Sequence, residues 1–327
     1  MTTDMLLEIK GLQTHFHTED GIVRAVDGID LTIHAGETLA LVGESGCGKS
    51  VTALSILQLV AQPGRIENGQ IIFEGRNLLD LEENQMQDIR GNRISLIFQE
   101  PMTSLNPVYR IGTQVAEVVR LHHRQKRVEA DRRAVEMLTK VGIPDPVRRM
   151  QEYPHQMSGG MRQRVMIAMA LACNPALIIA DEPTTALDVT IQAQILGLMN
   201  NLKERFGTSI LLITHDLGVV AEMAQSVAVM YAGQIIEYAP VEALFSSPKH
   251  PYTLGLMASI PSFDDPIPPD RMLNTIPGIV PGLIDLPPGC KFAGRCSRFT
   301  SECEQGTVPL IDTGFGHLAR CWHHGSR

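Results

Sequence analysis

GESGCGKS, residues 43–50, lies between two apolar runs, residues 38–42 and 51–57. The first run predicts a buried strand and the second a helix, so a glycine-rich loop joins the two. In such a loop the glycines let backbone N–H groups turn inward around a phosphate. The lysine then reaches the β- and γ-phosphates, and the last serine offers its hydroxyl to Mg²⁺. The helix adds the positive end of its dipole, so the stretch predicts a nucleoside triphosphate site.

The predicted phosphate site comprises Gly43, Ser45, Gly46, Cys47, Gly48, Lys49, Ser50 and Val51. The alternative is a chance glycine-rich turn, but the strand and helix around the complete motif favour the phosphate loop. Upstream, Phe16 is a candidate for stacking on an adenine ring. The default role of a single phenylalanine is in the core, so both interpretations stay open.

The overall composition gives no sign of a nucleic-acid or membrane protein. The chain has 327 residues, 44% of them hydrophobic, which suits about two to three compact units. The net charge is −8, so no global positive field attracts nucleic acid, and the basic cluster at 120–133 is expected to form solvated helix faces. No apolar run approaches the ~18–20 residues that span a bilayer. Since the N-terminus also lacks a secretory signal core, we expect a cytoplasmic location.

Other apolar runs predict strands and place polar residues at their ends. The expected strands are residues 6–9, 23–33, 69–75, 93–98, 177–182 and 209–214, and a hairpin of 227–231 with 234–238. Gln99 follows one strand, Asp181 and Glu182 end another, and His215 follows a third, at the sheet edge where ligands collect. Asp181 is suited to hold Mg²⁺ and Glu182 to polarise an attacking water. His215 could bond the γ-phosphate, although an isolated histidine is more often structural.

Residues 102–157 show helical periodicity and predict an inserted helical region. Ser158, Gly159 and Gly160 follow and open a helix predicted at 162–173. The free N–H groups of this helix start could bind a second anion, or the serine could be an ordinary N-cap. A short helix is expected at 241–245.

Several of these features recur together in one known family. GESGCGKS, Gln99, MSGGM at 157–161, LIIADE at 177–182, Ala186-Leu187-Asp188 and His215 occur in this order. Together they resemble the ATP-binding subunits of ABC transporters. The resemblance implies an α/β fold: a P-loop ABC ATPase core with an antiparallel β subdomain, a helical subdomain and an irregular cysteine-containing C-terminal extension.

The resemblance also implies a role for each motif. Glu182, His215 and Gln99 would be catalytic, as the Walker B glutamate, the switch histidine and the Q-loop glutamine. Mg²⁺ would be held by Ser50, Gln99 and Asp181. Ser158, Gly159 and Gly160 would be the signature that completes the ATP site of a partner subunit, Asp188 would belong to the D-loop, and Phe16 would stack on the adenine.

A narrower resemblance covers nearly the whole chain. SPKHPYTL at 247–254, LIFQEPMTSLNP at 96–107 and YPHQMSGGMRQRVMIAMAL at 153–171 are similar to the ATP-binding subunits of oligopeptide and dipeptide importers, and of dipeptide permeases in particular. This implies an ATPase domain at 1–250, with a helical insertion at about 102–172, and a proline-rich extension with four cysteines at 251–327. Nine of the twenty prolines lie at 251–290, a density that excludes long helices.

The implied partners are a homologous second ATP-binding subunit in a heterodimer, two membrane permease subunits and, through the complex, a periplasmic peptide-binding protein; nucleic acid is not expected. The implied place is the cytoplasmic face of the inner membrane, as a peripheral protein. A soluble ABC ATPase acting on nucleic acid or ribosomes is the alternative, but those proteins typically carry two cassettes in one chain. A metal-dependent regulator is a third reading, disfavoured by the complete set of catalytic motifs.

Four of the six cysteines, Cys290, Cys296, Cys303 and Cys321, lie in the last 38 residues. A reducing compartment disfavours disulfides. Four thiolates are the usual ligands of a 4Fe–4S cluster. Zinc is the alternative, although structural zinc sites favour cysteine pairs two to four residues apart. We therefore expect a 4Fe–4S cluster here, with a structural role.

Overall fold

The computed structural model describes residues 4–99, 104–185, 187–259 and 275–324, which fall into two compact units. Unit 1 consists of Met1–Leu6, Ile33–Thr38 and Phe73–Ile213. Unit 2 consists of Leu7–Thr32, Leu39–Ile72 and Thr214–Arg327. In the described part of the chain, no helix is both long enough and apolar enough to cross a membrane.

Unit 1 is built on a parallel sheet in which β7 (Leu177–Asp181) lies between β6 (Ile94–Ile97) and β8 (Ser209–Thr214). All six residues of β8 are buried, and so are the first four of β7. Parallel strands covered on both faces read as continuous apolar runs, which is why sequence located these strands correctly. Their carboxyl ends place Gln99 and Glu182 at the same edge of the sheet.

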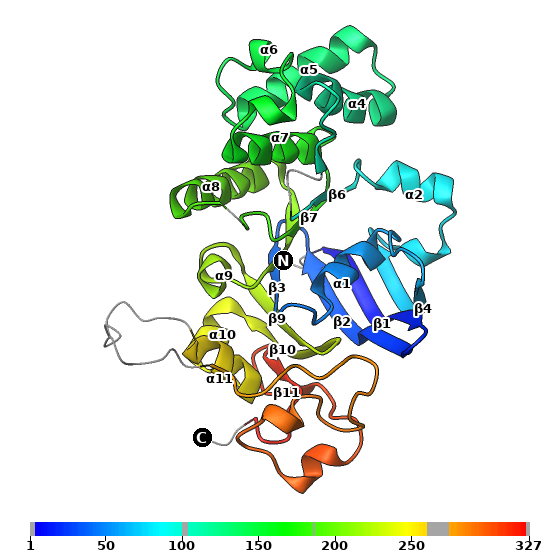
Figure 1. Cartoon of the computed structure of the whole chain (residues 1–327), viewed down its shortest axis with the longest axis vertical. Helices are drawn as coiled ribbons and strands as arrows, with labels where there is room; N and C mark the ends of the chain where they lie inside the picture. Colours follow the sequence, from blue (N-terminus) through cyan, green and yellow to red (C-terminus); the bar gives the residue numbers. More distant parts are fainter. Residues whose placement is uncertain (1–3, 100–103, 186, 260–274, 325–327) are drawn as a thin grey trace. The chain divides into compact units, whose positions relative to one another are not determined.

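The helices of unit 1 are α2 (Glu83–Ile89), α4 (Ile111–His123), α5 (Arg127–Lys140), α6 (Pro146–Arg149), α7 (Gly159–Leu171) and α8 (Val189–Phe206), with short 3₁₀ turns at Leu78–Asp80 and Pro154–Gln156. Figure 1 shows α4, α5, α6 and α7 gathered in one group. The predicted helical periodicity is confirmed by the residues buried along α4 and α5, namely Val115, Val119, Ala134, Met137 and Leu138. Helix α7 begins three residues earlier than predicted, since Ser158 caps it directly and both glycines become helical.

Unit 2 contains the strands β1 (Met5–Thr18), β2 (Gly21–His34) and β4 (Gly64–Phe73), in the order β2-β1-β4. A two-residue turn joins β1 to β2, so this pair is antiparallel. Both strands are longer than predicted. The added part of β1 alternates buried and less buried residues and ends at the exposed His17 and Thr18, so it shows no continuous apolar run.

The second sheet region of unit 2 contains the phosphate loop's own strand, β3 (Thr38–Val42), parallel to β9 (Ser226–Tyr231). Strand β10 (Gln234–Pro240) pairs antiparallel with β9, which confirms the predicted hairpin. The chain then returns from its C-terminal part. There β12 (Leu318–Ala319) pairs with β10, and β11 (Ile311–Asp312) pairs with β12. Two-residue strands carry no periodicity, so the sequence did not reveal them.

The remaining elements of unit 2 are the helices α1 (Lys49–Ile56), α9 (Leu217–Met223), α10 (Val241–Ser246) and α11 (Pro251–Ala258), and two 3₁₀ turns, Ala293–Arg295 and Ser301–Glu304. The short strand β5 (Arg76–Asn77) belongs to unit 1.

Aromatic packing attaches the C-terminal region to the sheet of unit 2. Tyr231 at the end of β9, Tyr252 in α11 and Phe292 are all buried. Their ring centroids lie 4.7 Å (Tyr231 to Tyr252), 5.3 Å (Tyr231 to Phe292) and 5.5 Å (Tyr252 to Phe292) apart. Tilted and edge-on aromatic pairs at this spacing stabilise beyond their buried area. The C-terminal region is therefore part of the hydrophobic core of unit 2.

A buried carboxylate reinforces the same attachment. Glu237 of β10 is fully buried and accepts hydrogen bonds from the backbone N–H groups of Lys249 (2.6 Å) and His250 (2.9 Å). Its Oε1 also lies 2.7 Å from Nε2 of His317. Burial alone would raise the pKa of Glu237, but these hydrogen bonds hold it below its ordinary value.

His250 begins α11 and is itself buried. Its Nδ1 accepts a hydrogen bond from the backbone N–H of Tyr252 at 3.0 Å, so this nitrogen carries no proton. Burial lowers the pKa of His250 from 6.5 to about 4. The folded chain therefore keeps the imidazole neutral in mildly acidic solution, where the unfolded chain protonates it.

We predict that this histidine makes unit 2 acid-sensitive. Its folded pKa is depressed, so its contribution is complete above pH 6.5 and is lost as the pH falls towards 4, by on the order of 3 kcal/mol in all. His250→Asn keeps an N-cap acceptor but cannot titrate. Its thermal midpoint should lie below that of the native chain at pH 7.5, and this deficit should shrink or reverse at pH 5.

The matched control is His123→Asn, at an exposed position of α4. It should change the midpoint equally at both pH values. A deficit for His250→Asn that is the same at pH 7.5 and pH 5 would show that the buried imidazole is not the sensor.

Candidate functional site

The phosphate loop has a backbone that only glycine can follow at two positions. Gly43 has φ 155° and Gly48 has φ 112°. A Cβ on Gly43 would lie 2.2 Å from the carbonyl oxygen of Met230, and one on Gly48 would lie 2.1 Å from that of Ala25. Because both neighbours are backbone atoms, neither collision can be relieved by a rotamer change. The loop is thus held against β9 on one side and β2 on the other.

Lys49 closes this loop from within. Its side chain is buried, and Nζ donates to the carbonyl oxygens of Gly43 (2.8 Å) and Glu44 (3.0 Å). Helix α1 begins at Lys49, and no side chain among the described residues caps that end. Uncapped N–H groups beside a lysine form a cradle suited to phosphate oxygens. Ser50, in the first turn, is exposed and offers the hydroxyl expected of a Mg²⁺ ligand.

The other predicted loop residues have different surroundings. Ser45 and Gly46 are exposed, and Val51 is half-buried. Cys47 is fully buried, its carbonyl oxygen accepts from the N–H of Gly233 at 2.9 Å, and burial raises the pKa of its thiol. Cys47 therefore fixes the loop to the β9–β10 turn, and its raised pKa disfavours the nucleophilic thiolate.

Phe16, on β1, is half-buried. A Cβ on Gly64 would lie 2.6 Å from Cε1 of its ring, so the ring rests on the backbone of Gly64. This contact orients the ring, and its stacking on adenine stays a prediction.

In unit 1 the structure joins two residues that the sequence placed 83 positions apart. Nε2 of Gln99 donates to Oε2 of Glu182 at 2.8 Å, and the hydroxyl of Thr185 donates to the same oxygen at 2.9 Å. Glu182 has φ 47°, a left-handed conformation that is costly for a residue with a side chain. Its N–H donates to the carbonyl oxygen of Ile213 on β8 at 2.9 Å, which holds it in place. Asp181, the last residue of β7, is half-buried beside it.

The serine-glycine-glycine sequence starts α7 as predicted. The hydroxyl of Ser158 accepts from the N–H of Met161 at 3.3 Å, so Ser158 is an N-cap. Gly159 is exposed, and Gly160 is half-buried. Asp188 caps α8 in the same manner, accepting from the N–H of Ile191 at 3.0 Å. Ala186 of the predicted D-loop lies outside the described residues.

The predicted ATP-site residues are divided between the two units. The phosphate loop, Phe16 and His215 belong to unit 2, where His215 is exposed directly after β8. Gln99, Asp181, Glu182 and the helix start at Ser158 belong to unit 1. Within the units, the structure brings Gln99 to Glu182 and Lys49 to the carbonyls of its own loop.

All four C-terminal cysteines line one cavity of about 10 Å³, together with His250, Phe292 and Val308. All six cysteines of the chain are free thiols. Burial raises the pKa of Cys290 to about 11 and also raises the pKa values of Cys296 and Cys321. In the described part of the chain, no three histidine, cysteine or acidic side chains stand close enough together to hold a metal ion. The structure thus groups the four thiols but does not present a finished metal site.

Sequence reasoning missed a group around Glu44, inside the phosphate loop. The carboxylate of Glu44 pairs with Arg295, and its N–H donates to the hydroxyl of Tyr252. The signal that the sequence offered was the negative charge of Glu44. An acidic residue in a loop that binds phosphate needs a cation elsewhere, yet nothing in the sequence indicates which of the 28 lysines and arginines supplies it.

Comparisons with known proteins agree with this geometry. A family model described as "ABC transporter" matches residues 26–185, and one described as "Oligopeptide/dipeptide transporter, C-terminal region" matches residues 236–303. A probable peptide ABC transporter ATP-binding protein of Sinorhizobium fredii is 55% identical over 98% of this chain and 95% of its own length. The oligopeptide transport ATP-binding protein AppD of Bacillus subtilis is 55% identical over 97% of this chain and 96% of its own.

A solved structure supports the fold independently. An ATP-binding cassette bound to ADP and Pi, a dimer in a post-hydrolysis state, superposes with a TM-score of 0.65 at 28% identity, covering 72% of this chain and 99% of the cassette. The fold is therefore the mixed α/β fold of an ABC ATPase cassette. Because both the phosphate-loop region and the C-terminal region match, and relatives match over nearly the full length, the chain belongs to the ATP-binding proteins of the oligopeptide/dipeptide ABC transporter family.

Proposed function

We propose that this chain hydrolyses ATP to drive the import of dipeptides or oligopeptides through a membrane complex. The observation that carries the proposal is the match of residues 236–303 to the C-terminal region of oligopeptide/dipeptide transporters, in a chain that also has a complete phosphate loop. The relatives named for peptide or oligopeptide transport match this chain over nearly its full length. No contact in the described structure identifies a peptide, so the substrate class rests on this likeness.

The proposed chemistry assigns a separate task to each group. Lys49 and the N–H groups of the loop bind the phosphates, and Ser50 with Asp181 supplies oxygen ligands for Mg²⁺. Glu182 polarises the attacking water, while the amide of Gln99 orients its carboxylate, as their 2.8 Å hydrogen bond supports. The proposed role of His215 is a hydrogen bond to the γ-phosphate.

The proposed assembly is a head-to-tail pair of ATP-binding subunits, in which Ser158, Gly159 and Gly160 of one subunit complete the ATP site of the other. A dimeric cassette of the same fold supports this arrangement. We propose that the partner is a homologous ATP-binding subunit. The pair would dock on two permease subunits at the cytoplasmic face of the inner membrane and receive peptide from a periplasmic binding protein. The division into an ATPase domain at 1–250 and an extension at 251–327 remains part of this proposal.

Uptake and co-purification together test the function. Deletion of the gene should abolish uptake of a labelled dipeptide or short oligopeptide by the source cell, and the native chain should restore it. An affinity-tagged chain should co-purify, in mild detergent, with two integral membrane proteins and a second ATP-binding subunit. Normal peptide uptake after deletion, or recovery of ribosomes or nucleic acid as the stoichiometric partner, would contradict the proposal.

We predict that Glu182→Gln separates ATP binding from turnover. The amide keeps the shape of the side chain and can still bond Gln99 and Thr185, but it is no general base. Turnover of the assembled complex should fall about 100-fold or more, with ATP affinity retained. The measurements are phosphate release and ATP titration. Glu204→Gln, the same change at an exposed site on α8, is the control and should keep full turnover; near-normal hydrolysis by Glu182→Gln would refute the role of Glu182.

We further propose that the four C-terminal cysteines bind a structural 4Fe–4S cluster, with zinc as the alternative. The number and type of donors suit a cluster, because four thiols line one cavity. That cavity has room for about one water-sized body, so a cluster also requires the thiols to move outward. Bound metal would supply cross-links to a region with little regular secondary structure. Since burial raises the pKa values of Cys290, Cys296 and Cys321, metal binding should release protons from these thiols.

Metal analysis after anaerobic purification tests this proposal. About four irons and four sulphides per chain are expected, and Cys303→Ser or Cys321→Ser should deplete them. Cys173→Ser removes a buried cysteine that does not line the cavity, and it should leave the metal content unchanged. One zinc per chain without sulphide would show a zinc site instead of the cluster. A metal-free chain would contradict both the cluster and the zinc site.

A further inference from the structure

Glu44, the second residue of the phosphate loop, is held at each of its polar groups. Its carbonyl oxygen accepts from Nζ of Lys49 at 3.0 Å. Its N–H donates to the hydroxyl of Tyr252 at 2.9 Å. Its carboxylate accepts two hydrogen bonds from Arg295, at 2.7 Å (Nη1 to Oε2) and 3.1 Å (Nη2 to Oε1). Two of these three partners belong to the C-terminal region, more than 200 residues away in sequence.

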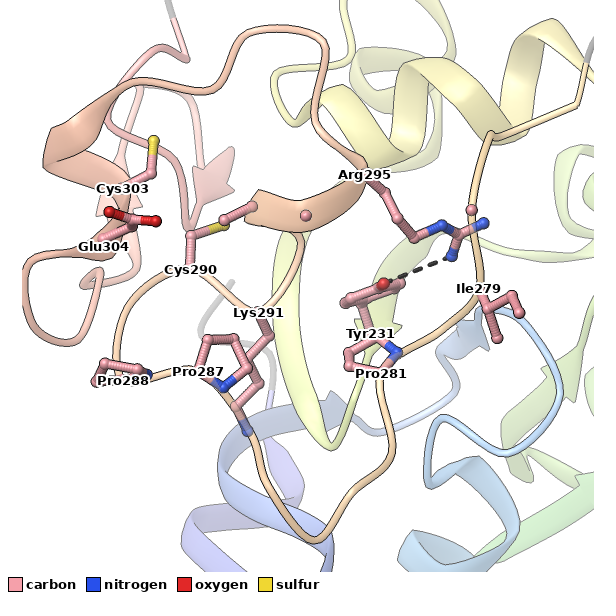
Figure 2. A pocket seen from close by; sticks show the side chains of 13 residues that line it. Tyr231, Ile279, Pro281, Pro287, Pro288, Cys290, Lys291, Arg295, Cys303 and Glu304 are labelled. Carbon is pink, nitrogen blue, oxygen red and sulfur yellow. Dashed lines mark hydrogen bonds between the residues drawn. The ribbon is translucent and has the colours of Figure 1, made fainter.

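Arg295 is held in place by burial and by several hydrogen bonds. Only 6% of its side chain is exposed, against 30% for Glu44. Besides the carboxylate, it donates to the carbonyl oxygens of Ile276 (3.2 Å) and Pro277 (3.0 Å) and lies 3.4 Å from the hydroxyl of Tyr231. Figure 2 shows Arg295 directed towards Tyr231 at the edge of a cavity of about 630 Å³. The hydrogen bonds to Glu44 raise the guanidinium pKa, so the charge is permanent.

The negative charge of Glu44 is the reason to expect a functional role for its ion pair with Arg295. A carboxylate at position 44 adds negative charge to a loop that must receive a polyanion, and like charges repel most where water is excluded. A buried guanidinium in bidentate contact cancels that charge and also fixes the side chain's direction. An arginine used only to fasten the C-terminal region would not need a partner inside the phosphate loop.

The segment that carries Arg295 makes further contacts around the loop. Nζ of Lys291 donates to Asp27 on β2 at 2.6 Å and to the carbonyl oxygen of Ala232 at 3.1 Å. The next residue, Gly233, donates its N–H to Cys47 of the phosphate loop. The phosphate loop is therefore supported from the C-terminal region by a direct ion pair and by an indirect contact through the β9–β10 turn.

We propose that Arg295 is a positioning residue of the ATP site: it neutralises Glu44 and fixes the direction of its carboxylate, while Tyr252 holds the backbone of the loop. The C-terminal region thereby sets the affinity for ATP. This inference rests on the proposed binding of ATP by the loop.

The test measures ATP binding to the full chain with Mg²⁺ for three variants. Arg295→Gln should weaken binding about 10-fold, because it leaves an uncompensated carboxylate beside the phosphates. Glu44→Gln should tighten binding by about 3-fold, because it removes that negative charge and leaves Arg295 in place. In Arg295→Gln/Glu44→Gln, affinity should return to within about 3-fold of the native value. In the assembled complex, Arg295→Gln should raise KM while kcat changes less than about 3-fold.

A purely structural pair gives a different pattern. In that case Glu44→Gln weakens binding as Arg295→Gln does, and the double variant shows no recovery; either result overturns the proposal. Unchanged affinity in a folded Arg295→Gln also overturns it. If Arg295→Gln does not fold, the direction of the Glu44→Gln effect still decides between the two.

Two further variants test whether a loss of affinity is specific to Arg295 and whether the loop binds ATP. Arg320→Gln removes a half-buried arginine that donates to the carbonyl oxygens of Ile235 (2.9 Å) and Val308 (2.7 Å) in the same region. It should lower the thermal midpoint without the 10-fold loss of affinity, and an equal loss would show that any damage to the region weakens binding. Lys49→Ala should weaken binding strongly. If it does not, the phosphate-loop assignment itself fails, whereas weak binding by Lys49→Ala with normal binding by Arg295→Gln rejects only the role of Arg295.

Discussion

The close approach of the phosphate loop to two neighbouring backbones is the constraint on which the rest of the site depends. At Gly43 and Gly48 the loop runs so near to Met230 and Ala25 that there is no space for a side chain. A loop that must point its N–H groups inward cannot fix its own shape through side-chain packing, since its glycines have none. Its conformation is instead imposed from outside, by β2 and by the β9–β10 hairpin.

That dependence explains why so much of unit 2 serves a short loop. The hairpin holds Cys47 through Gly233. The hairpin is itself held by the C-terminal region, through Glu237, the pairing of β10 with β12, and the aromatic contacts of Tyr231. The C-terminal region thus restricts the motion of the hairpin, and the hairpin restricts the motion of the phosphate loop. Ordering the loop before the ligand arrives reduces the entropy that binding must overcome, so stability far from the phosphates is expressed as affinity at the phosphates.

How far the sequence predicted the structure depended on the range of the interactions. The phosphate loop, the buried strands and the hairpin were predicted because their signals are local: glycine spacing, apolar runs and turn residues. The proximity of Gln99 and Glu182 was also accessible, because both follow parallel strands of one sheet. The pairing of Arg295 with Glu44 was not, since it joins residues 251 positions apart through side chains alone. The strand β12 was missed for a related reason, because its two residues acquire their pairing from β10 and not from their own pattern.

Two of the C-terminal cysteines bound the segment that supports the phosphate loop. Cys290 and Cys296 flank a segment of five residues that contains Lys291, Phe292 and Arg295, the three side chains that reach Asp27, the aromatic core and Glu44. Cys290 also lines both the four-cysteine cavity and the larger one that Arg295 borders (Figure 2). A segment this short cannot change the spacing of its ends without moving the residues between them. Whatever fixes the distance between Cys290 and Cys296 therefore also fixes the platform from which Arg295 reaches the phosphate loop, which gives a cross-link at the cysteines a physical route to the ATP site.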